Sequence, residues 1–219
     1  MDVHIWSDVV CPWCYLGKRR FEQALARFEH RDDVRVVHRS FQLDPSRPRH
    51  QTVNRREMLK AKYQLSDQQV RDMDVRMEGL AANEGLEYHL TDTGVTGNTL
   101  DAHQLLQLGK VRGVQDAVLE RLYRAYFTEQ RSIFDRETLV ALAREAGLDE
   151  AEARDALERD ACVDGVAADV REARALGVTG VPFYVVGGRY GVSGAQAVDV
   201  FSEVLSKAWE DTVATSARA

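Results

Sequence analysis

The first 41 residues alternate apolar and polar positions in a pattern that predicts a strand, a helix and a second strand. Val3 and Ile5 occupy alternate positions in residues 2–7, as in a strand with one buried face. Residues 12–29 carry apolar side chains at helical spacing, and residues 34–41 are rich in β-branched residues. The chain therefore opens with a β-α-β unit in which the helix is the crossover.

The middle of the chain is patterned for helices. From about residue 52 to 177, apolar residues recur at helical spacing with few strand signals. Ser66, Asp135 and Asp149 stand where helix N-caps are expected, because each can accept a hydrogen bond from the first turn. Residues 92–98 contain two glycines and are expected to form a loop.

Strand signals return only near the C-terminus. Residues 181–186 are apolar, a Gly-Gly pair follows them, and residues 189–193 can return as a second strand of a hairpin. A last helix is expected from about Ala195 to Trp209, and the polar residues after it are expected to fray.

A β-α-β half followed at a distance by a β-β-α half is the arrangement of a thioredoxin fold. This places the chain in the α/β class, with a central mixed β-sheet flanked by helices. We expect residues 1–43 and 178–219 to form one discontinuous thioredoxin-like domain. Residues 44–177 are expected to form a large, all-helical insertion domain.

Cys11 and Cys14 stand three residues apart at the start of the first predicted helix. There the spacing puts both sulfurs on one face, one turn apart, close enough for a disulfide. The free N–H groups and the positive dipole end of the first turn stabilise a thiolate, so Cys11 is the expected attacking thiol. Cys14 lies one turn further in and is the expected resolving thiol. The motif predicts a thiol–disulfide exchange centre.

Three neighbours of the cysteines have less specific roles. Pro12 fits the first helical turn, where a missing N–H costs little, and it stands beside the attacking sulfur. Trp13 points away from the buried stripe and is either an apolar contact for the substrate or a rim residue. Asp8 either tunes the thiols or caps the turn into the helix.

Val181 and Pro182 form a second candidate element at the start of a predicted strand. Beside a CxxC motif in this fold order, we expect a cis peptide bond. It would bring the backbone N–H and C=O of Val181 next to the sulfurs, where they could pair with an extended substrate chain. The alternative is an ordinary trans proline at a strand start.

Cys162 is the third cysteine and stands apart from the motif. It shares a helical stripe with Val166, Val170 and Ala173, which predicts an inert cysteine on a buried helix face. A zinc site would need two ligands beyond the CxxC pair, and neither a second CxxC nor an HxxxH motif is present. No metal is therefore expected.

Composition and charge narrow the function classes. The chain has 219 residues, 44% hydrophobic and 29% charged, which suits a globular protein with a substantial core. The net charge of −6 gives no reason to expect nucleic-acid binding. No apolar run approaches the ~20 residues that span a bilayer.

The N-terminus runs directly into the first strand without a leader pattern, so we expect a cytoplasmic protein. In a reducing compartment, a CxxC pair is more often catalytic than structural.

These residues resemble the DsbA-like thioredoxin superfamily, and most closely its cytoplasmic FrnE-like branch. The resemblance is carried, in order, by residues 7–17, 97–103, 124–127, 177–183 and 192–196. It implies dithiol–disulfide oxidoreductase activity without a bound cofactor, on thiol- or disulfide-bearing protein substrates, with glutathione as a candidate co-substrate. It also implies that Cys11 is the nucleophile, Cys14 the resolving thiol and Pro182 the cis-proline.

The chain departs from this pattern in two places. Thioredoxin-type sites often carry a buried carboxylate six residues before the first cysteine, and here that position is Ile5. Another group, such as Asp8 or a water molecule, would then have to manage the proton of Cys14. Some FrnE-like relatives carry additional cysteines near the C-terminus, whereas this chain has none after Cys162.

Two alternative functions stay open at this point. A sister group of the same fold, the kappa-class glutathione transferases and 2-hydroxychromene-2-carboxylate isomerases, shares the Asn-Thr and Ala-His pattern of residues 98–103. In a glutathione-dependent enzyme of that kind, Asn98 and His103 would be candidate substrate-binding residues, although a lone helical histidine is more often structural. The second alternative is a non-enzymatic redox sensor or holdase.

Overall fold

The computed structural model describes residues 1–91 and 94–216. The chain divides into two compact units. The sheet unit comprises Met1–Phe41 and Asp169–Ala219, and the helical unit comprises Gln42–Ala168. The expected borders were after residues 43 and 177, whereas the two units divide after Phe41 and after Ala168.

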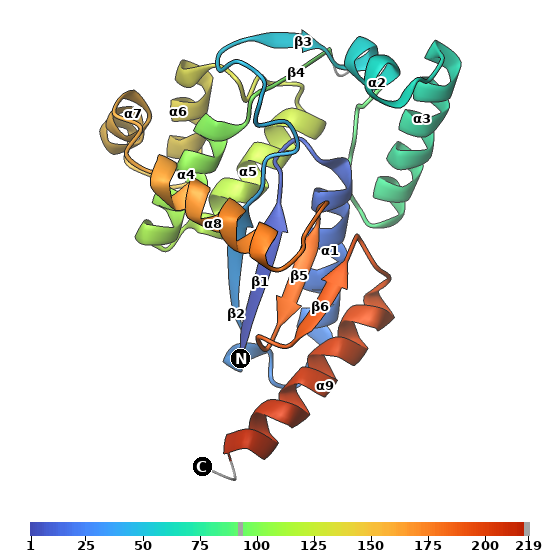
Figure 1. Ribbon diagram of the computed structural model, residues 1–219, viewed down its shortest axis with the longest axis vertical. Helices are drawn as coiled ribbons and strands as arrows, with labels where there is room; N and C mark the ends of the chain where they lie inside the picture. The colour runs from blue at the N-terminus through green and yellow to red at the C-terminus, as the bar shows by residue number, and fades with distance from the viewer. Residues whose placement is uncertain (92–93, 217–219) are drawn as a thin grey trace. The chain divides into compact units, whose positions relative to one another are not determined.

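The sheet unit contains a four-stranded mixed sheet in the order β2-β1-β5-β6 (Figure 1). Strand β1 (Asp2–Ser7) pairs in parallel with β2 (Arg35–Ser40). It pairs antiparallel with β5 (Phe183–Val186), which in turn pairs antiparallel with β6 (Tyr190–Ser193). The β-α-β and β-β-α halves predicted from the sequence therefore meet in one sheet, and the α/β thioredoxin-like fold is confirmed.

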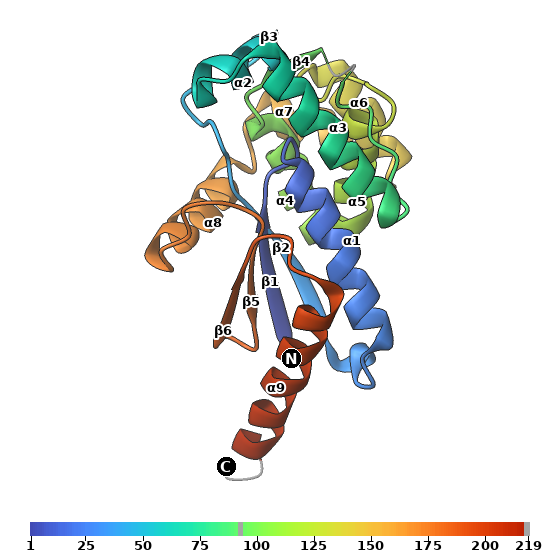
Figure 2. The same cartoon turned by 90° about the vertical axis from the view of Figure 1, so that its right-hand side faces the viewer.

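Helices cover both faces of this sheet (Figure 2). On one face lie α1 (Pro12–Arg27) and α9 (Val198–Ser216), and the C-terminal half of α8 (Val163–Ala175) lies on the other. The core under α1 and α9 is formed by Val3, Ile5, Phe21, Ala24, Tyr184, Val186, Val192, Phe201, Leu205 and Ala208. The opposite core centres on Trp6, Ala173 and Val178. Successive side chains of β1 and β5 point to opposite faces of the sheet, so these two strands contribute apolar residues to both cores, as the period-2 pattern predicts.

Asp169, in the middle of α8, attaches this helix to the sheet. Its carboxylate accepts hydrogen bonds from the Arg39 guanidinium and the Ser40 backbone N–H, each at 2.9 Å. Its carbonyl oxygen accepts a hydrogen bond from the Trp6 indole at 3.0 Å. Because Asp169 itself is 3% exposed, these contacts satisfy a charge that would otherwise be costly to bury.

Several element ends differ from expectation. Helix α1 ends at Arg27 because Phe28 has extended backbone angles. Strand β5 begins at Phe183, after the two residues that were expected to open it. Helix α9 begins at Val198 and continues to Ser216, well past the expected end at Trp209. Such shifts at element ends are common because the first and last turns depend on tertiary neighbours.

The helical unit is not all-helical, and that expectation was wrong. Beside its helices it holds a two-stranded antiparallel sheet of β3 (Thr52–Asn54) and β4 (Val95–Gly97). Part of the expected loop 92–98 therefore forms a strand, and residues 92–93 lie outside the described residues. A side chain at Gly97 would come within 2.9 Å of the Phe134 ring, which explains the glycine in this strand.

Three helices of this unit begin after the caps that the sequence predicts. Ser66 caps the following helix with a complete capping box, and the Asp135 and Asp149 carboxylates each accept a backbone N–H three residues on. The helices are α2 (Arg55–Tyr63), α3 (Asp67–Asn83), α4 (Leu100–Arg112), α5 (Gln115–Phe127), α6 (Arg136–Glu145), α7 (Glu150–Glu158) and the N-terminal half of α8. Over residues 1–91 and 94–216, the helices lack the combination of length and apolarity needed to cross a membrane.

Candidate redox site

Both cysteines of the motif stand at the N-terminus of α1. Cys11 is the N-cap residue with an extended backbone, and Pro12 is the first helical residue, where its missing N–H costs no hydrogen bond. The backbone N–H of Cys14 donates to the Cys11 carbonyl at 3.0 Å. Cys11 is 5% exposed and Cys14 is 1% exposed, and both are free thiols. Cys11 is thus the more accessible of the two sulfurs.

The Val181–Pro182 peptide bond is cis, as expected from the sequence. Cys11 Sγ lies 3.6 Å from the carbonyl oxygen of Val181 and donates a hydrogen bond to it. The loop that leads into β5 therefore borders Cys11 directly. A substrate chain that reaches Cys11 would meet the backbone of Val181 at the same place.

Cys14 is held in its protonated form. Burial raises the pKa of the Cys14 thiol well above its ordinary value, and a hydrogen bond with Cys11 and the charge of Cys11 raise it further. A protonated thiol is not a nucleophile, so Cys14 cannot attack a disulfide until it loses its proton. This is the behaviour expected of a resolving cysteine.

Asp8 closes the turn between β1 and α1. Its carbonyl accepts a hydrogen bond from the backbone N–H of Cys11 at 3.1 Å, and the residue is 1% exposed. A hydrogen bond from the Asp8 backbone lowers the pKa of Cys14, and the charge of Asp8 raises it, both after the larger effects of burial and Cys11. Asp8 therefore serves the local turn, and its two effects on Cys14 oppose each other.

Trp13 is 45% exposed, although it directly follows Pro12 in the motif. Trp13 stands between the two buried cysteines in the sequence, and its large apolar side chain is exposed. Both earlier interpretations, a substrate contact and a rim residue, agree with this exposure.

Asn98 and His103 belong to the helical unit, whereas the cysteines and Pro182 belong to the sheet unit. The Asn98 side chain donates to the Arg47 carbonyl at 2.7 Å and accepts from the Leu100 backbone N–H at 2.8 Å. His103 is 0% exposed within α4. Asn98 thus has a clear structural use inside its own unit, as a cap for the start of α4.

Cys162 is not on a buried helix face, and that part of the prediction was wrong. It precedes the first residue of α8 and is only partly buried, whereas Val166 and Ala173 of the same stripe are buried. Its backbone N–H donates to the Gln104 side chain at 3.4 Å. Partial burial, followed by the charge of Glu152, raises the pKa of its thiol, which lowers its reactivity.

Sequence reasoning missed Tyr184. It lies on β5, is 0% exposed, and its hydroxyl oxygen is buried without a hydrogen-bond partner among the described residues. A Cβ atom at Gly17 would lie 2.5 Å from this oxygen. The only signal in the sequence was that a tyrosine, with its polar hydroxyl, stands at an inward-facing position of the strand that follows Pro182.

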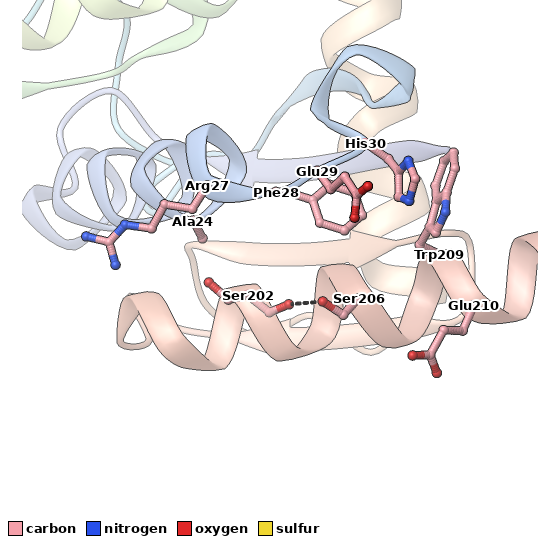
Figure 3. Close-up of a pocket in the computed structure, with 9 residues that line it drawn as sticks. All are labelled: Ala24, Arg27, Phe28, Glu29, His30, Ser202, Ser206, Trp209 and Glu210. Carbon is pink, nitrogen blue, oxygen red and sulfur yellow. Dashed lines mark hydrogen bonds between the residues drawn. The ribbon is translucent and has the colours of Figure 1, made fainter.

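A separate groove of about 350 Å³ lies at the other end of α1, against α9 (Figure 3). His30 and Trp209 stack across it with ring centroids 4.4 Å apart, and Phe28 stands beside them. None of the three cysteines lines this groove. Nor do the histidine, cysteine and carboxylate side chains of the described residues gather anywhere in a group suited to hold a metal ion.

Comparisons with known proteins agree with this geometry. Residues 2–206 match the family model of the DSBA-like thioredoxin domain. The chain is 30% identical over 210 residues to the uncharacterised protein YwbO of Bacillus subtilis (strain 168), covering 94% of this chain and 97% of that protein.

Two solved structures extend the comparison. The probable DsbA oxidoreductase SCO1869 from Streptomyces coelicolor is 51% identical and superposes with a TM-score of 0.92, covering 96% of this chain and 90% of that one. The cytosolic disulfide reductase DsbM from Pseudomonas aeruginosa, solved with GSH, is 22% identical with a TM-score of 0.62 over the full length of both chains. The second likeness concerns the fold alone. The chain belongs to the DSBA-like thioredoxin domain family and is a thiol–disulfide oxidoreductase.

Proposed function

We propose that Cys11 and Cys14, together with the Val181–Pro182 loop, form the active centre of a protein disulfide oxidoreductase or isomerase. The observation that supports this most strongly is the 3.6 Å contact between Cys11 Sγ and the Val181 carbonyl. It joins the more accessible cysteine to a backbone that an extended substrate could pair with. The buried, protonated Cys14 behind it supplies the resolving thiol.

The exchange has two steps. The Cys11 thiolate attacks one sulfur of a substrate disulfide, so a Cys11–substrate bond forms, the substrate disulfide breaks, and its other sulfur leaves and takes up a proton. Cys14 then loses its proton and attacks Cys11 Sγ. A Cys11–Cys14 disulfide forms and the substrate leaves as a dithiol. The pair loses two electrons and the substrate gains them, and oxidation of a substrate dithiol is the same sequence reversed.

Substrate contacts in this proposal come from the surface around Cys11. Pro12 and the exposed Trp13 present apolar surface beside the sulfur, and Val181 presents its backbone. Such contacts are independent of the substrate's sequence, which suits an enzyme acting on cysteines in many chains.

Single-cysteine variants test the proposal. Cys11→Ser is expected to abolish reduction of insulin, because no attacking thiol is left. Cys14→Ser is expected to accumulate mixed disulfides with substrate, visible by non-reducing electrophoresis and mass spectrometry. Cys162→Ser is the matched control and should exchange at the wild-type rate. Full insulin reduction by Cys11→Ser would refute the assignment.

The direction of electron flow is measured by equilibrating the pair in glutathione buffers. Trp13 fluorescence and thiol trapping report the fraction of disulfide. A potential near about −270 mV indicates a reductant, and one near about −120 mV indicates an oxidant. A reversible disulfide with negligible turnover would instead indicate a redox sensor.

Glutathione is the co-substrate that we propose for this cycle, in a cytoplasmic, FrnE-like enzyme. The fold neighbour DsbM is described as a cytosolic disulfide reductase and was solved with GSH. Reduction of the Cys11–Cys14 disulfide by glutathione, followed by stopped-flow fluorescence, tests this. Glutathione-dependent turnover of small organic compounds that survives Cys14→Ser would favour the isomerase or transferase alternative.

A further inference from the structure

The hydroxyl of Tyr184 is a polar group that the packing of the sheet unit does not explain. The Tyr184 ring packs against Phe21 and Phe201, with centroids 5.7 and 4.7 Å away. Its oxygen is buried and has no hydrogen-bond partner in the part of the chain that the structure describes. A buried hydroxyl without a partner destabilises the folded state, and phenylalanine would fill the same space without that penalty. The oxygen therefore calls for a role.

The oxygen lies against α1 at Gly17, one helical turn beyond Cys14. A Cβ atom at Gly17 would come within 2.5 Å of it and within 3.1 Å of Pro182 Cγ. Gly17 follows Cys14 by three residues on α1, so both lie on one face of the helix, one turn apart. The absence of a side chain at position 17 lets the Tyr184 hydroxyl approach this face.

The neighbouring strand offers no competing acid or base. The residue paired with Tyr184 across β1 is Ile5, which is buried and apolar. The titratable groups that act on Tyr184 are, in order, Cys14, Cys11, Glu22 and, more weakly and with opposite sign, Arg20. Burial and the charges on Cys14 and Cys11 raise the pKa of the Tyr184 phenol well above its usual value. The phenol therefore keeps its proton and can donate it in a hydrogen bond.

We propose that the Tyr184 hydroxyl is the hydrogen-bond donor that stabilises Cys14 as it becomes a thiolate. The inference rests on the proposed function and concerns its second step. In the dithiol, the Cys14 thiol has a hydrogen bond with Cys11, and the Tyr184 hydroxyl remains available. When Cys14 attacks Cys11 Sγ, the new disulfide forms and the Cys11–substrate bond breaks. The Cys14 proton ends on the departing substrate sulfur, while Tyr184 retains its own.

The test is the ionisation of Cys14 with and without the hydroxyl. In a Cys11→Ser, Cys162→Ser background Cys14 is the only thiol, and its pKa is read from the pH dependence of iodoacetamide alkylation. Adding Tyr184→Phe is expected to raise that pKa by about one pH unit, a roughly tenfold lower thiolate fraction at a given pH. In the enzyme with both cysteines, Tyr184→Phe is expected to slow release of the mixed disulfide by a similar factor.

Tyr190→Phe is the matched control. Tyr190 lies on β6 of the same sheet, and its hydroxyl donates to Asp211 at 2.6 Å. Its removal is expected to leave the Cys14 titration unchanged. Tyr184→Phe should unfold at the same or a higher urea concentration than the parent, because it removes an unpartnered buried oxygen.

An unchanged Cys14 titration in folded Tyr184→Phe would overturn the inference. A second measurement needs no change at position 184: the ring-carbon NMR shift of Tyr184 in the single-thiol protein should follow the titration of Cys14. A Tyr184 ring-carbon shift that stays constant while Cys14 titrates would also overturn the inference. The alkylation and NMR measurements both use a protein without Cys11, which cannot carry out thiol–disulfide exchange. Failure of the proposed function would therefore appear in a different experiment, the insulin reduction assay of the wild-type protein.

Discussion

Cys11 Sγ and the carbonyl oxygen of Val181 are 170 positions apart in the chain and 3.6 Å apart in the structure. The hydrogen bond between them joins the N-cap of α1 to the loop just before β5. It occurs because β1 pairs antiparallel with β5, so that the last residues of β1 and the first residues of β5 lie at the same end of the sheet. Two segments of unrelated sequence thereby become one site.

The different environments of the three cysteines predict an order of alkylation. At pH 7 iodoacetamide should label Cys11 first, at the helix N-terminus. Cys162 should react slowly, because partial burial raises its pKa. Cys14 should react last, because its raised pKa keeps it protonated at pH 7 and at the ordinary cysteine pKa of about 8.5. Its labelling should begin only well above that pH. Peptide mass spectrometry over time at several pH values measures this, and early labelling of Cys14 at pH 7 would contradict the site geometry.

The close approach of Gly17 and Tyr184 predicts a coupled pair of substitutions. Gly17→Ala should destabilise the protein by roughly 1–3 kcal/mol, because its Cβ would lie 2.5 Å from the Tyr184 oxygen. In a Tyr184→Phe background the same change should cost less, although Pro182 Cγ and Ala195 Cβ stay near. Urea unfolding of the four proteins gives the coupling, and equal costs in both backgrounds would show that the hydroxyl is not the obstacle.

A buried ion pair predicts the largest loss of stability in the helical unit. Arg55 donates to both carboxylate oxygens of Asp74, at 2.8 and 2.9 Å, and the two residues are 7% and 2% exposed. Asp74→Ala should therefore cost about 3–5 kcal/mol, since it leaves a buried guanidinium without its partner. Glu57→Ala, which breaks the exposed pair with Lys60, is the control and should leave the unfolding free energy nearly unchanged. Similar effects for the two would contradict the burial of the first pair.

Much of the sheet unit could be predicted from local pattern. The alternation around Val3 and Ile5, the helical spacing after Pro12 and the Gly-Gly turn each describe one element, and each element formed close to its expected place. The caps at Ser66 and Asp135 were equally readable, because a cap and its helix are adjacent in sequence. The errors came where a distant partner decided the outcome. Val95–Gly97 became a strand because Thr52–Asn54 pairs with it, and Cys162 stayed partly exposed because α8 begins after it.

The sequence by itself determined that two cysteines share one face of a helix start, since three-residue spacing and helical geometry suffice for that. Fold order also predicted that Val181 would lie beside the sulfurs, and its carbonyl oxygen lies 3.6 Å from Cys11 Sγ. Only the tertiary structure decided that the Tyr184 hydroxyl lies against Gly17 and that Asp169 attaches α8 to the sheet. Both depend on packing between segments far apart in the chain. The physical reason is that hydrophobic periodicity specifies which side of an element is buried. It does not specify which distant side chain that buried surface will meet.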